Sequence, residues 1–373
     1  MTLAILTPIT IVVTPPPWLP FRSVGQHIYL EATANDAPVW LLLDTGATAS
    51  FLDTAATRRA HPSGDPSKLE PIRLRIAGRP YGRHRFAPFP LGFSEFDGQT
   101  VDGLLGYDFL QNFAVEIDYL GRRLRFHPKA TYTMPAGFVS IPLHLLEDDS
   151  GGKLPLATIR VTTADGDTAS GDFIIDTGAR GVAVLATPFG KTKAWFDPAA
   201  PRWTPLVGSG SLVKNLRLPV GRVRDLQIGP FILIAPVIGV AQDTTGILSA
   251  TEFSGIVAGE LLSRFRVVFD YGQSRLGLAP NRTYGLRFDF DHCGCTLVAD
   301  HQSVRVADVL PASPAAEAGL AVGDRLARAD GAVVRPSQLD AVRATFRTKT
   351  TRRLTIRRGA QLLAITLRLR PLI

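Results

Sequence analysis

The sequence predicts a mainly β protein in which two similar lobes are followed by a smaller β-rich domain of the α+β type. A pattern of strands, turn and acidic motif occurs twice in the first 280 residues, which is typical of a duplicated lobe. The chain also holds 34 Gly and 28 Pro between short apolar runs, as expected for many short strands joined by turns. From Gly285 onward the chain carries 14 basic and 8 acidic residues, against 27 basic and 25 acidic residues before it. The C-terminal region is therefore distinctly more basic than the rest.

The chain is too long for one core and suits two or three domains. We therefore divide its 373 residues into an N-terminal segment (1–21), a first lobe (22–130), a connection (131–152), a second lobe (153–283) and a C-terminal domain (284–373). An apolar content of 45% with 20% charged residues excludes wholesale disorder. The two cysteines, Cys293 and Cys295, lie too close in sequence to join distant segments.

The N-terminal segment is open to two interpretations. Ile9 to Val13 is almost entirely β-branched, which favours a strand. Leu3 to Val13 lacks a preceding basic residue and is interrupted by Pro8, so it is a poor secretory signal. A remnant of an export signal or a misassigned start remains the alternative. The compartment is not determined, and an exported location such as the periplasm is the one we favour.

The net charge of +8 arises mainly in the C-terminal domain, where seven basic residues gather between 343 and 358. No aromatic residues alternate with them, so a solvated face is favoured over nucleic-acid binding. An acidic peptide or an anionic lipid surface remains a possible partner. No apolar run reaches the roughly 18 residues that cross a bilayer, so we expect no membrane span.

The first half of the repeat ends in the same tetrapeptide in both copies. His27 to Ala47 predicts a strand, a turn at Asn35-Asp36 and an apolar strand that runs into Asp44-Thr45-Gly46-Ala47. Leu156 to Ala179 predicts the same order, with a turn near Asp165-Gly166 and an apolar strand before Asp176-Thr177-Gly178-Ala179. The two aspartates are 132 residues apart.

The second half of the repeat aligns Asp102 to Pro128 with Ser254 to Pro280 without a gap. Nine positions are identical: Gly103/Gly255, Leu110/Leu262, Phe113/Phe265, Val115/Val267, Asp118/Asp270, Tyr119/Tyr271, Arg123/Arg275, Leu124/Leu276 and Pro128/Pro280. Each copy predicts a brief helix (Asp108 to Asn112; Glu260 to Arg264) and then a strand hairpin (Ala114 to Phe126; Arg266 to Leu278). Asp102 is replaced by Ser254 in the repeat, which favours a structural role for Asp102.

These two motifs resemble the active-site loops of an aspartic peptidase. Each Asp-Thr-Gly-Ala follows an apolar strand, and each lobe has a later apolar pair with glycine, Leu104-Leu105-Gly106 and, more loosely, Ile256-Val257-Ala258-Gly259. The alanine after each glycine is similar to retropepsins, whereas pepsin-type enzymes usually carry Ser or Thr there. The resemblance covers about residues 22 to 280 and implies a single-chain, two-lobed aspartic-peptidase fold.

The resemblance implies that Asp44 and Asp176 are the catalytic residues. Two carboxylates about 3 Å apart cannot both ionise, so one acts as general base on a water and the other as general acid. Thr45 and Thr177 can hydrogen-bond backbone across the lobes, and Gly46 and Gly178 permit tight turns beside Ala47 and Ala179. No metal or cofactor is expected. Because one chain supplies both loops, we expect a monomer with an intramolecular site.

Aspartic peptidases also close a glycine-rich hairpin over the substrate. The first lobe offers Gly78 to Gly82 with Tyr81, and the second lobe offers Val207 to Ser211 with Gly208, Ser209 and Gly210. An ordinary surface hairpin is the alternative for both segments. The second segment lies inside the 20 extra residues of the second copy, which favours a flap there.

The C-terminal domain resembles a bacterial PDZ domain. The resemblance rests on Ser313 to Leu320, followed by Gly323-Asp324-Arg325-Leu326 and Asp330-Gly331. It implies that an extended peptide, with its terminal carboxylate held by loop amides, binds at a sheet edge. The candidate loop is Gly294-Cys295-Thr296-Leu297, although its glycine pattern is degraded. Ser337 to Phe346 is the expected groove helix with Ser337 as N-cap, and the closing strands are Arg353 to Ile356 and Leu362 to Leu369.

Other site chemistries have little support, because the seven histidines show no metal-ligand spacing and no nucleophile elbow or phosphate loop is present. His292, Cys293 and Cys295 alone do not make a metal site. We therefore expect an aspartic endopeptidase that acts on peptides or proteins and whose PDZ domain recruits or regulates substrates. The alternatives are a non-catalytic peptide-binding scaffold on a peptidase fold and an enzyme restricted to one dedicated partner.

Overall fold

The computed structural model describes residues 15–62, 70–91, 98–197, 206–208, 216–299, 302–348 and 350–373. Strands make up 44% and helices 12% of the structure, which confirms the prediction of a mainly β protein. The residues before Pro15, including the expected strand at 9–13, lie outside the described part. Within the described part, no helix is long and apolar enough to span a membrane.

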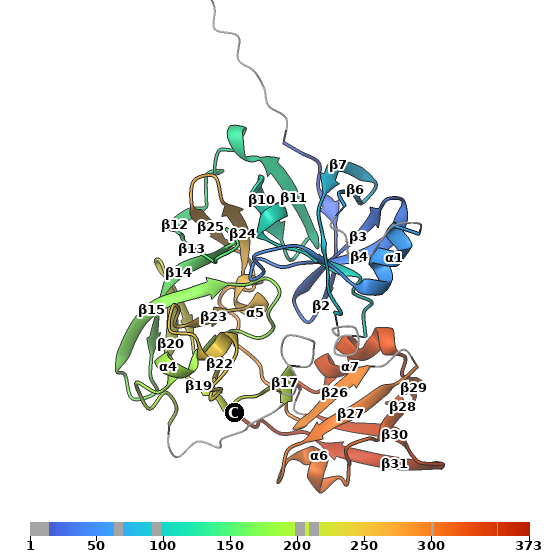
Figure 1. The fold of residues 1–373 in the computed structure, drawn as a ribbon. Helices are drawn as coiled ribbons and strands as arrows, with labels where there is room; N and C mark the ends of the chain where they lie inside the picture. The colour runs from blue at the N-terminus through green and yellow to red at the C-terminus, as the bar shows by residue number, and fades with distance from the viewer. Residues whose placement is uncertain are drawn as a thin grey trace, which may run out of the picture.

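The first lobe is built on an eight-stranded sheet with the order β7-β6-β3-β4-β9-β5-β8, in which β2 also pairs with β3 (Figure 1). Asn35 and Asp36, at φ 46° and 72°, form the tight turn expected between β3 and β4. Short helices α1 (Thr54–Ala60) and α3 (Tyr107–Leu110) accompany the sheet. Its strands are β2 (Arg22–Val24), β3 (His27–Ala34), β4 (Ala37–Leu43), β5 (Phe51–Leu52), β6 (Ile72–Ile76), β7 (Arg79–His84), β8 (Ala87–Pro88) and β9 (Gly103–Leu105).

The second lobe holds a nine-stranded sheet with the order β19-β22-β16-β23-β15-β14-β20-β21, in which β13 also pairs with β14. A separate pair joins β17 (Leu206–Gly208) to β18 (Leu216–Arg217). Helices α4 (Thr187–Gly190) and α5 (Gly259–Leu262) and the 3-10 turn η2 (Ile247–Ser249) complete the lobe. The strands of the sheet are β13 (His144–Glu147), β14 (Lys153–Thr162), β15 (Thr168–Ile175), β16 (Ala183–Leu185), β19 (Val220–Arg222), β20 (Asp225–Ile228), β21 (Phe231–Ile234), β22 (Val237–Val240) and β23 (Gly255–Val257).

A third sheet joins the two lobes. Its order is β1-β11-β10-β24-β25-β12, so the two aligned hairpins pair with each other at its centre. Ala114 pairs with Asp270 and Asp118 pairs with Arg266, and these two pairs exchange under the sequence repeat. The sheet therefore carries the pseudo-two-fold axis. Its strands are β1 (Leu19–Pro20), β10 (Phe113–Asp118), β11 (Arg123–Pro128), β12 (Val139–Pro142), β24 (Phe265–Asp270) and β25 (Arg275–Pro280), and the 3-10 turn η1 (Lys129–Thr131) follows β11.

Residues 131–152, which the sequence predicted to be a connection between the lobes, contain two strands of these sheets. Residues 139–142 form β12, which pairs with β25, and residues 144–147 form β13 in the second-lobe sheet. Likewise β1, inside the expected N-terminal segment, pairs with β11. Burial of Leu19, Ile141 and Leu143 explains why these segments become strands. Each repeat thus includes a strand that precedes the boundary expected from sequence.

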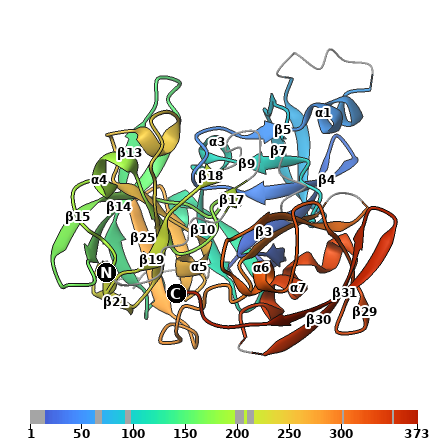
Figure 2. The same cartoon turned by 90° about the horizontal axis from the view of Figure 1, so that it is seen from below.

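The C-terminal region forms its own sheet, with the order β26-β27-β28-β30-β31 and β29 paired to β28 (Figure 2). Its buried residues make a core separate from the one shared by the lobes. The elements are β26 (Cys295–Ala299), β27 (Val304–Val309), α6 (Pro314–Glu317), β28 (Arg325–Ala329), β29 (Ala332–Val333), η3 (Pro336–Gln338), α7 (Leu339–Thr345), β30 (Thr351–Arg358) and β31 (Gln361–Arg368).

The prediction that Ser337 caps the long helix of this domain is wrong. Ser337 lies inside the 3-10 turn η3, and α7 begins at Leu339 with Gln338 as its N-cap residue. Pro336 occupies the first position of η3, and Arg335 is its N-cap residue, whose amide donates to Gln338 Oε1 at 3.0 Å. The fixed φ of proline favours that first position, so the turn starts before Ser337.

Candidate active site

Both candidate aspartates follow a buried strand that lies in the middle of its sheet. Asp44 follows β4, which runs parallel to β9, and its amide donates to Leu105 O at 3.0 Å. Asp176 follows β15, which runs parallel to β23, and its amide donates to Val257 O at 2.9 Å. The two apolar elements identified from sequence are therefore the strands that support the two aspartate loops.

The threonines of the two loops hydrogen-bond across the lobes in a reciprocal pattern. Thr45 Oγ1 donates to Ile175 O at 2.7 Å, and Thr177 Oγ1 donates to Leu43 O at 2.7 Å. Thr45 N donates to Thr177 Oγ1 at 3.1 Å, and Thr177 N donates to Thr45 Oγ1 at 3.0 Å. Both threonines are fully buried. Four hydrogen bonds thus fix the position of one loop relative to the other.

The glycines of the motifs bring each carboxyl group against the opposite loop. Gly46 N donates to Asp44 Oδ1 at 3.0 Å, and Gly178 N donates to Asp176 Oδ1 at 2.6 Å. A Cβ on Gly46 would lie 2.4 Å from Asp176 Cγ, and one on Gly178 would lie 2.5 Å from Asp44 Cγ. No side chain fits at either position, so glycine is required for the two carboxyl groups to meet.

The two carboxyl groups are buried together and share one proton. Desolvation raises the pKa of Asp44 well above its ordinary range, and the negative charge of Asp176 raises it further. Desolvation also raises the pKa of Asp176, while the Gly178 amide and the charge of His27 oppose that rise. Because both pKa values are raised, the pair holds one proton between its two carboxyl groups.

Gly259 stands one position later in the repeat than Gly106, but the backbone hydrogen bond to the aspartate loop is the same in both lobes. Tyr107 N donates to Ala47 O at 2.9 Å, and the aligned Gly259 N donates to Ala179 O at 3.0 Å. A Cβ on Gly106 would lie 2.3 Å from Ala49 O, whereas the aligned Ala258 is accommodated in a buried position. Asp102 accepts from Trp40 N and pairs with Arg59, which are structural contacts.

The two flap candidates differ in placement. Tyr81 packs edge-on against Phe109, Phe113 and Phe126, and β7 lies at the outer edge of the first sheet. Tyr81 therefore contributes to the lobe core, which corrects its expected place in a flap. Gly208 ends β17, which pairs with β18. Ser209 and Gly210 lie outside the described residues.

The structure also shows residues near the carboxyl pair that the sequence patterns did not single out. Burial raises the pKa of Tyr119 and Tyr271, and the charge of Asp176 raises both further. The charge of His27 lowers the pKa of Asp176. Neither tyrosine hydroxyl finds a hydrogen-bond partner among the described residues. The identity of Tyr119 and Tyr271 in the repeat was a signal that could have identified them.

The candidate peptide-binding loop of the C-terminal domain is close to β26, the edge strand of its sheet. Gly294, at φ 76°, precedes β26, and its amide donates to the Asp291 carboxylate at 2.6 Å. Cys295, Thr296 and Leu297 form the start of β26. The Cys293 and Cys295 sulfurs are 3.2 Å apart as free thiols. No group of three or more potential metal ligands occurs among the described residues.

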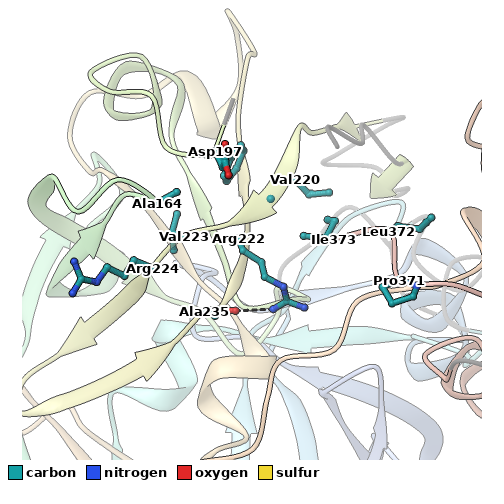
Figure 3. A pocket seen from close by; sticks show the side chains of 12 residues that line it. Ala164, Asp197, Val220, Arg222, Val223, Arg224, Ala235, Pro371, Leu372 and Ile373 are labelled. Carbon is teal, nitrogen blue, oxygen red and sulfur yellow. Dashed lines mark hydrogen bonds between the residues drawn. The ribbon is translucent and has the colours of Figure 1, made fainter. Parts of the chain in front are cut away.

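A cavity of about 560 Å³ lies in the second lobe beside the end of the chain. Its lining comes from β19, the residues next to β20 and β21, residues 371–373, and Ala164, Phe196 and Asp197, and neither aspartate loop contributes to it. Figure 3 shows Arg222 in this cavity, where its guanidinium donates to Ala235 O at 2.7 Å. The cavity is therefore distinct from the carboxyl pair.

Comparison with known proteins identifies one part of the chain. A family model described as PDZ domain matches residues 305–358. Residues 305–358 form a PDZ domain. The match confirms the resemblance drawn from Ser313 to Gly331, and it supports a role in binding proteins or peptides. We use the name PDZ domain below for the sheet β26–β31 with its helices.

The other comparisons add nothing about the lobes. The comparison with curated proteins found no match. A solved structure of an aminopeptidase N family protein from Idiomarina loihiensis is 18% identical, with a TM-score of 0.21. The likeness covers 23% of this chain and 15% of that chain. A similarity this small carries no argument about fold or function.

Proposed function

We propose that the protein is an aspartic endopeptidase of the retropepsin-like type. It hydrolyses a peptide bond of the substrate that is held between the carboxyl groups of Asp44 and Asp176. The observation that supports this most is the reciprocal hydrogen bonding of the two Asp-Thr-Gly-Ala loops. It brings together two carboxyl groups that share one proton. A pair in which one carboxyl is neutral and the other ionised is the arrangement that acid and base catalysis at one centre requires.

We assign the base role to Asp176, which accepts the shorter amide hydrogen bond, 2.6 Å against 3.0 Å for Asp44, because such a bond stabilises a carboxylate. Asp176, the ionised member, takes a proton from a water molecule while the water oxygen bonds to the carbonyl carbon of the substrate. Asp44 gives its proton to the carbonyl oxygen, which produces a tetrahedral diol. In the second step Asp176 returns a proton to the amide nitrogen and Asp44 takes one from a hydroxyl, as the carbon–nitrogen bond breaks. Every step uses side chains of this chain alone.

The PDZ domain supplies protein recognition in this proposal. The edge strand β26 can add an extended peptide to the sheet, as peptide-binding domains of this kind do. Such binding would recruit a protein substrate to the lobes or regulate them. The PDZ residues discussed above include no acid and base pair of the kind found in the lobes, so we assign cleavage to the lobes.

A non-catalytic scaffold that binds peptides on the same fold is the competing function. Both aspartates and both threonines are in place, which favours the enzyme. An enzyme dedicated to one partner would be inactive on general substrates and would be mistaken for a scaffold. Binding of a statine-containing peptide, which imitates the tetrahedral diol, separates these cases, because a dedicated enzyme still binds such a compound at the carboxyl pair.

The test is digestion of a peptide library by the full chain and by Asp44→Asn and Asp176→Asn. Each substitution should abolish cleavage, because it removes one member of the proton-sharing pair. Thermal stability should be retained, because desolvation already favours the neutral form of each side chain. Asp172→Asn is the matched control. Asp172 lies on β15, the strand that ends just before Asp176, and it accepts from Thr158 Oγ1 at 2.7 Å. It should be dispensable for cleavage. Cleavage by either active-site variant, with contaminating peptidases excluded, would refute the mechanism.

A further inference from the structure

Helix α7 of the PDZ domain contacts the second lobe at two ion pairs. Asp340, in the first turn of α7, lies 3.7 Å from Arg180, and Arg347, just beyond the helix, lies 3.8 Å from Glu260. Figure 1 shows α7 on the side of the PDZ domain that faces the lobes. The helix expected to line the peptide groove is therefore also one of the parts of the domain that meet the lobe containing Asp176; β27 is another, where Arg217 Nη1 donates to Asp308 at 2.9 Å.

Both lobe partners belong to the segments that frame Asp176. Arg180 directly follows the Asp176-Thr177-Gly178-Ala179 motif, and Glu260 is the second residue of α5. Gly259 N donates to Ala179 O at 3.0 Å, and Glu260 N donates to Gly181 O at 2.9 Å. The loop after Asp176 and the start of α5 are thus joined by backbone hydrogen bonds. A displacement of either segment is transmitted to the other.

Arg180 also touches the first lobe. Its guanidinium lies over Gly25, where a Cβ would be only 1.7 Å from Arg180 Nη2. Gly25 belongs to the turn between β2 and β3, at φ 56°. Only 20% of the Arg180 side chain is exposed. One arginine next to the catalytic motif therefore connects the first lobe, the second lobe and the PDZ domain.

The same helix closes the peptide groove from the other side. Arg343 Nη2, from the middle of α7, donates to Leu297 O at 2.6 Å. Leu297 belongs to β26, whose outer edge is where an extended peptide would pair. A peptide that pairs with this edge competes with Arg343 for the Leu297 carbonyl oxygen. Occupation of the groove and the position of α7 are therefore linked through one hydrogen bond.

We propose that α7 couples the PDZ groove to the active site, with Arg180 as a positioning residue. The contacts of Asp340 and Arg347 hold the loop after Asp176 in the arrangement described above. A peptide paired with β26 weakens the hydrogen bond between Arg343 and Leu297, shifts α7 relative to the lobe and loosens that loop. An occupied groove therefore lowers cleavage. The effect on cleavage rests on the proposed function, but the structural coupling does not.

The first test measures amide hydrogen exchange in residues 177–182 of the full chain, without any ligand. Asp340→Asn should accelerate exchange there about fivefold, at the low end of couplings between sites. Glu317→Gln is the matched control, because Glu317 pairs with Arg370 inside the PDZ domain and should leave residues 177–182 unchanged. Equal exchange in Asp340→Asn and the control would overturn the proposal.

Arg343→Ala tests the link to the groove, because it releases Leu297 O as a bound peptide would. It should accelerate exchange in residues 177–182 although Arg343 touches neither Asp176 nor Arg180 in any contact described above. Acceleration confined to residues 295–299 and 339–347 would show that the groove and the active-site loop are independent. Circular dichroism of each variant confirms that the exchange differences do not arise from unfolding.

The last test measures cleavage of a short peptide that the library digestion identifies. Asp340→Asn should lower kcat about fivefold with little change in KM. Asp340→Glu keeps the negative charge and should have a kcat near that of the wild type. The difference should shrink at 1 M salt, where the Debye length falls to about 3 Å. Full activity of Asp340→Asn, despite faster loop exchange, would overturn the coupling to catalysis. If the wild type neither cleaves a library peptide nor binds the statine-containing peptide, the proposed function fails, while the exchange experiments still decide the coupling.

Discussion

Thr177→Val removes one half of the hydrogen bonding between the two aspartate loops and changes the volume of the side chain little. The hydroxyl of Thr177 donates to Leu43 O at 2.7 Å and accepts from Thr45 N at 3.1 Å. A methyl group can do neither, and 2.7 Å is too close for a methyl beside a carbonyl oxygen. The variant thus leaves two buried backbone groups without the partner they have now.

The magnitude follows from the number of groups left unpaired. Each buried donor or acceptor that loses its partner costs about 1–3 kcal/mol, so two such groups cost about 2–6 kcal/mol. For a unit of this size, a central value of about 4 kcal/mol corresponds to a decrease in Tm of about 8–16 °C. Activity should fall as well, because the spacing of the two carboxyl groups is no longer fixed. Thr45→Val should behave alike, since its contacts mirror those of Thr177.

The assay is thermal unfolding followed by circular dichroism, with Thr33→Val as the matched control. The hydroxyl of Thr33 is buried in β3 and has no hydrogen-bond partner among the described residues. Replacing it with a methyl group should therefore be neutral or stabilising. If Thr177→Val and Thr33→Val melt at the same temperature, the hydrogen bonds between the loops contribute nothing to stability and the reasoning is wrong.

Three further predictions concern pH and assembly. Because Ala47 and Ala179 have no hydroxyl to stabilise the carboxylates, cleavage should be fastest at roughly pH 5 to 7, and Ser at both positions should shift the acid limb of kcat/KM to lower pH. Desolvation raises the pKa of Glu116, but His127, Arg125 and Arg266 outweigh it and lower the pKa from 4.5 to about 2. Glu116 thus stabilises the fold above pH 4.5 and loses this contribution as the pH falls toward 2. Glu116→Gln should remove up to about 3 kcal/mol of stability at pH 7. Specific activity should not change on dilution, because one chain supplies both aspartates.

Each of these predictions has a contrary result. A wild-type optimum near pH 3, or an unmoved acid limb in a folded and active double Ser variant, would contradict the role of the alanines. Chemical denaturation at several pH values tests Glu116, and an unchanged loss of stability between pH 4.5 and 2 in Glu116→Gln would contradict its assignment. A second-order loss of activity at low enzyme concentration would show that two chains build the site.

Local patterns predicted the strands that lead into the two motifs, the two aligned hairpins and the turn at Asn35-Asp36. The alternation of apolar residues and the Asn-Asp pair act over a few neighbours, so they are visible in the sequence. The N-cap of the helix that includes Leu339 was expected one residue early, because proline and serine can begin either a 3-10 turn or an α-helix. The strands β1 and β12 were not predicted, because each is short and is stabilised by a partner strand that is distant in sequence.

Tyr81 shows why a glycine-rich hairpin does not reveal its own role. The glycines at 78 and 82 predict a turn, and the aromatic side chain between them fits either a flap or a core. The ring packs in the lobe because Phe109, Phe113 and Phe126, from distant parts of the chain, contact it. The choice is made by long-range contacts that no local pattern records.

The sequence by itself determined that the lobes are duplicated, that each carries an Asp-Thr-Gly-Ala motif at the end of an apolar strand, and that a PDZ-like segment follows. These features depend on residue order and short-range periodicity. Only the tertiary structure decided that Thr45 and Thr177 bond reciprocally, that β10 pairs with β24 between the lobes, and that α7 meets Arg180. Such contacts join residues more than a hundred positions apart, so they exist only once the buried surfaces of the lobes have packed together.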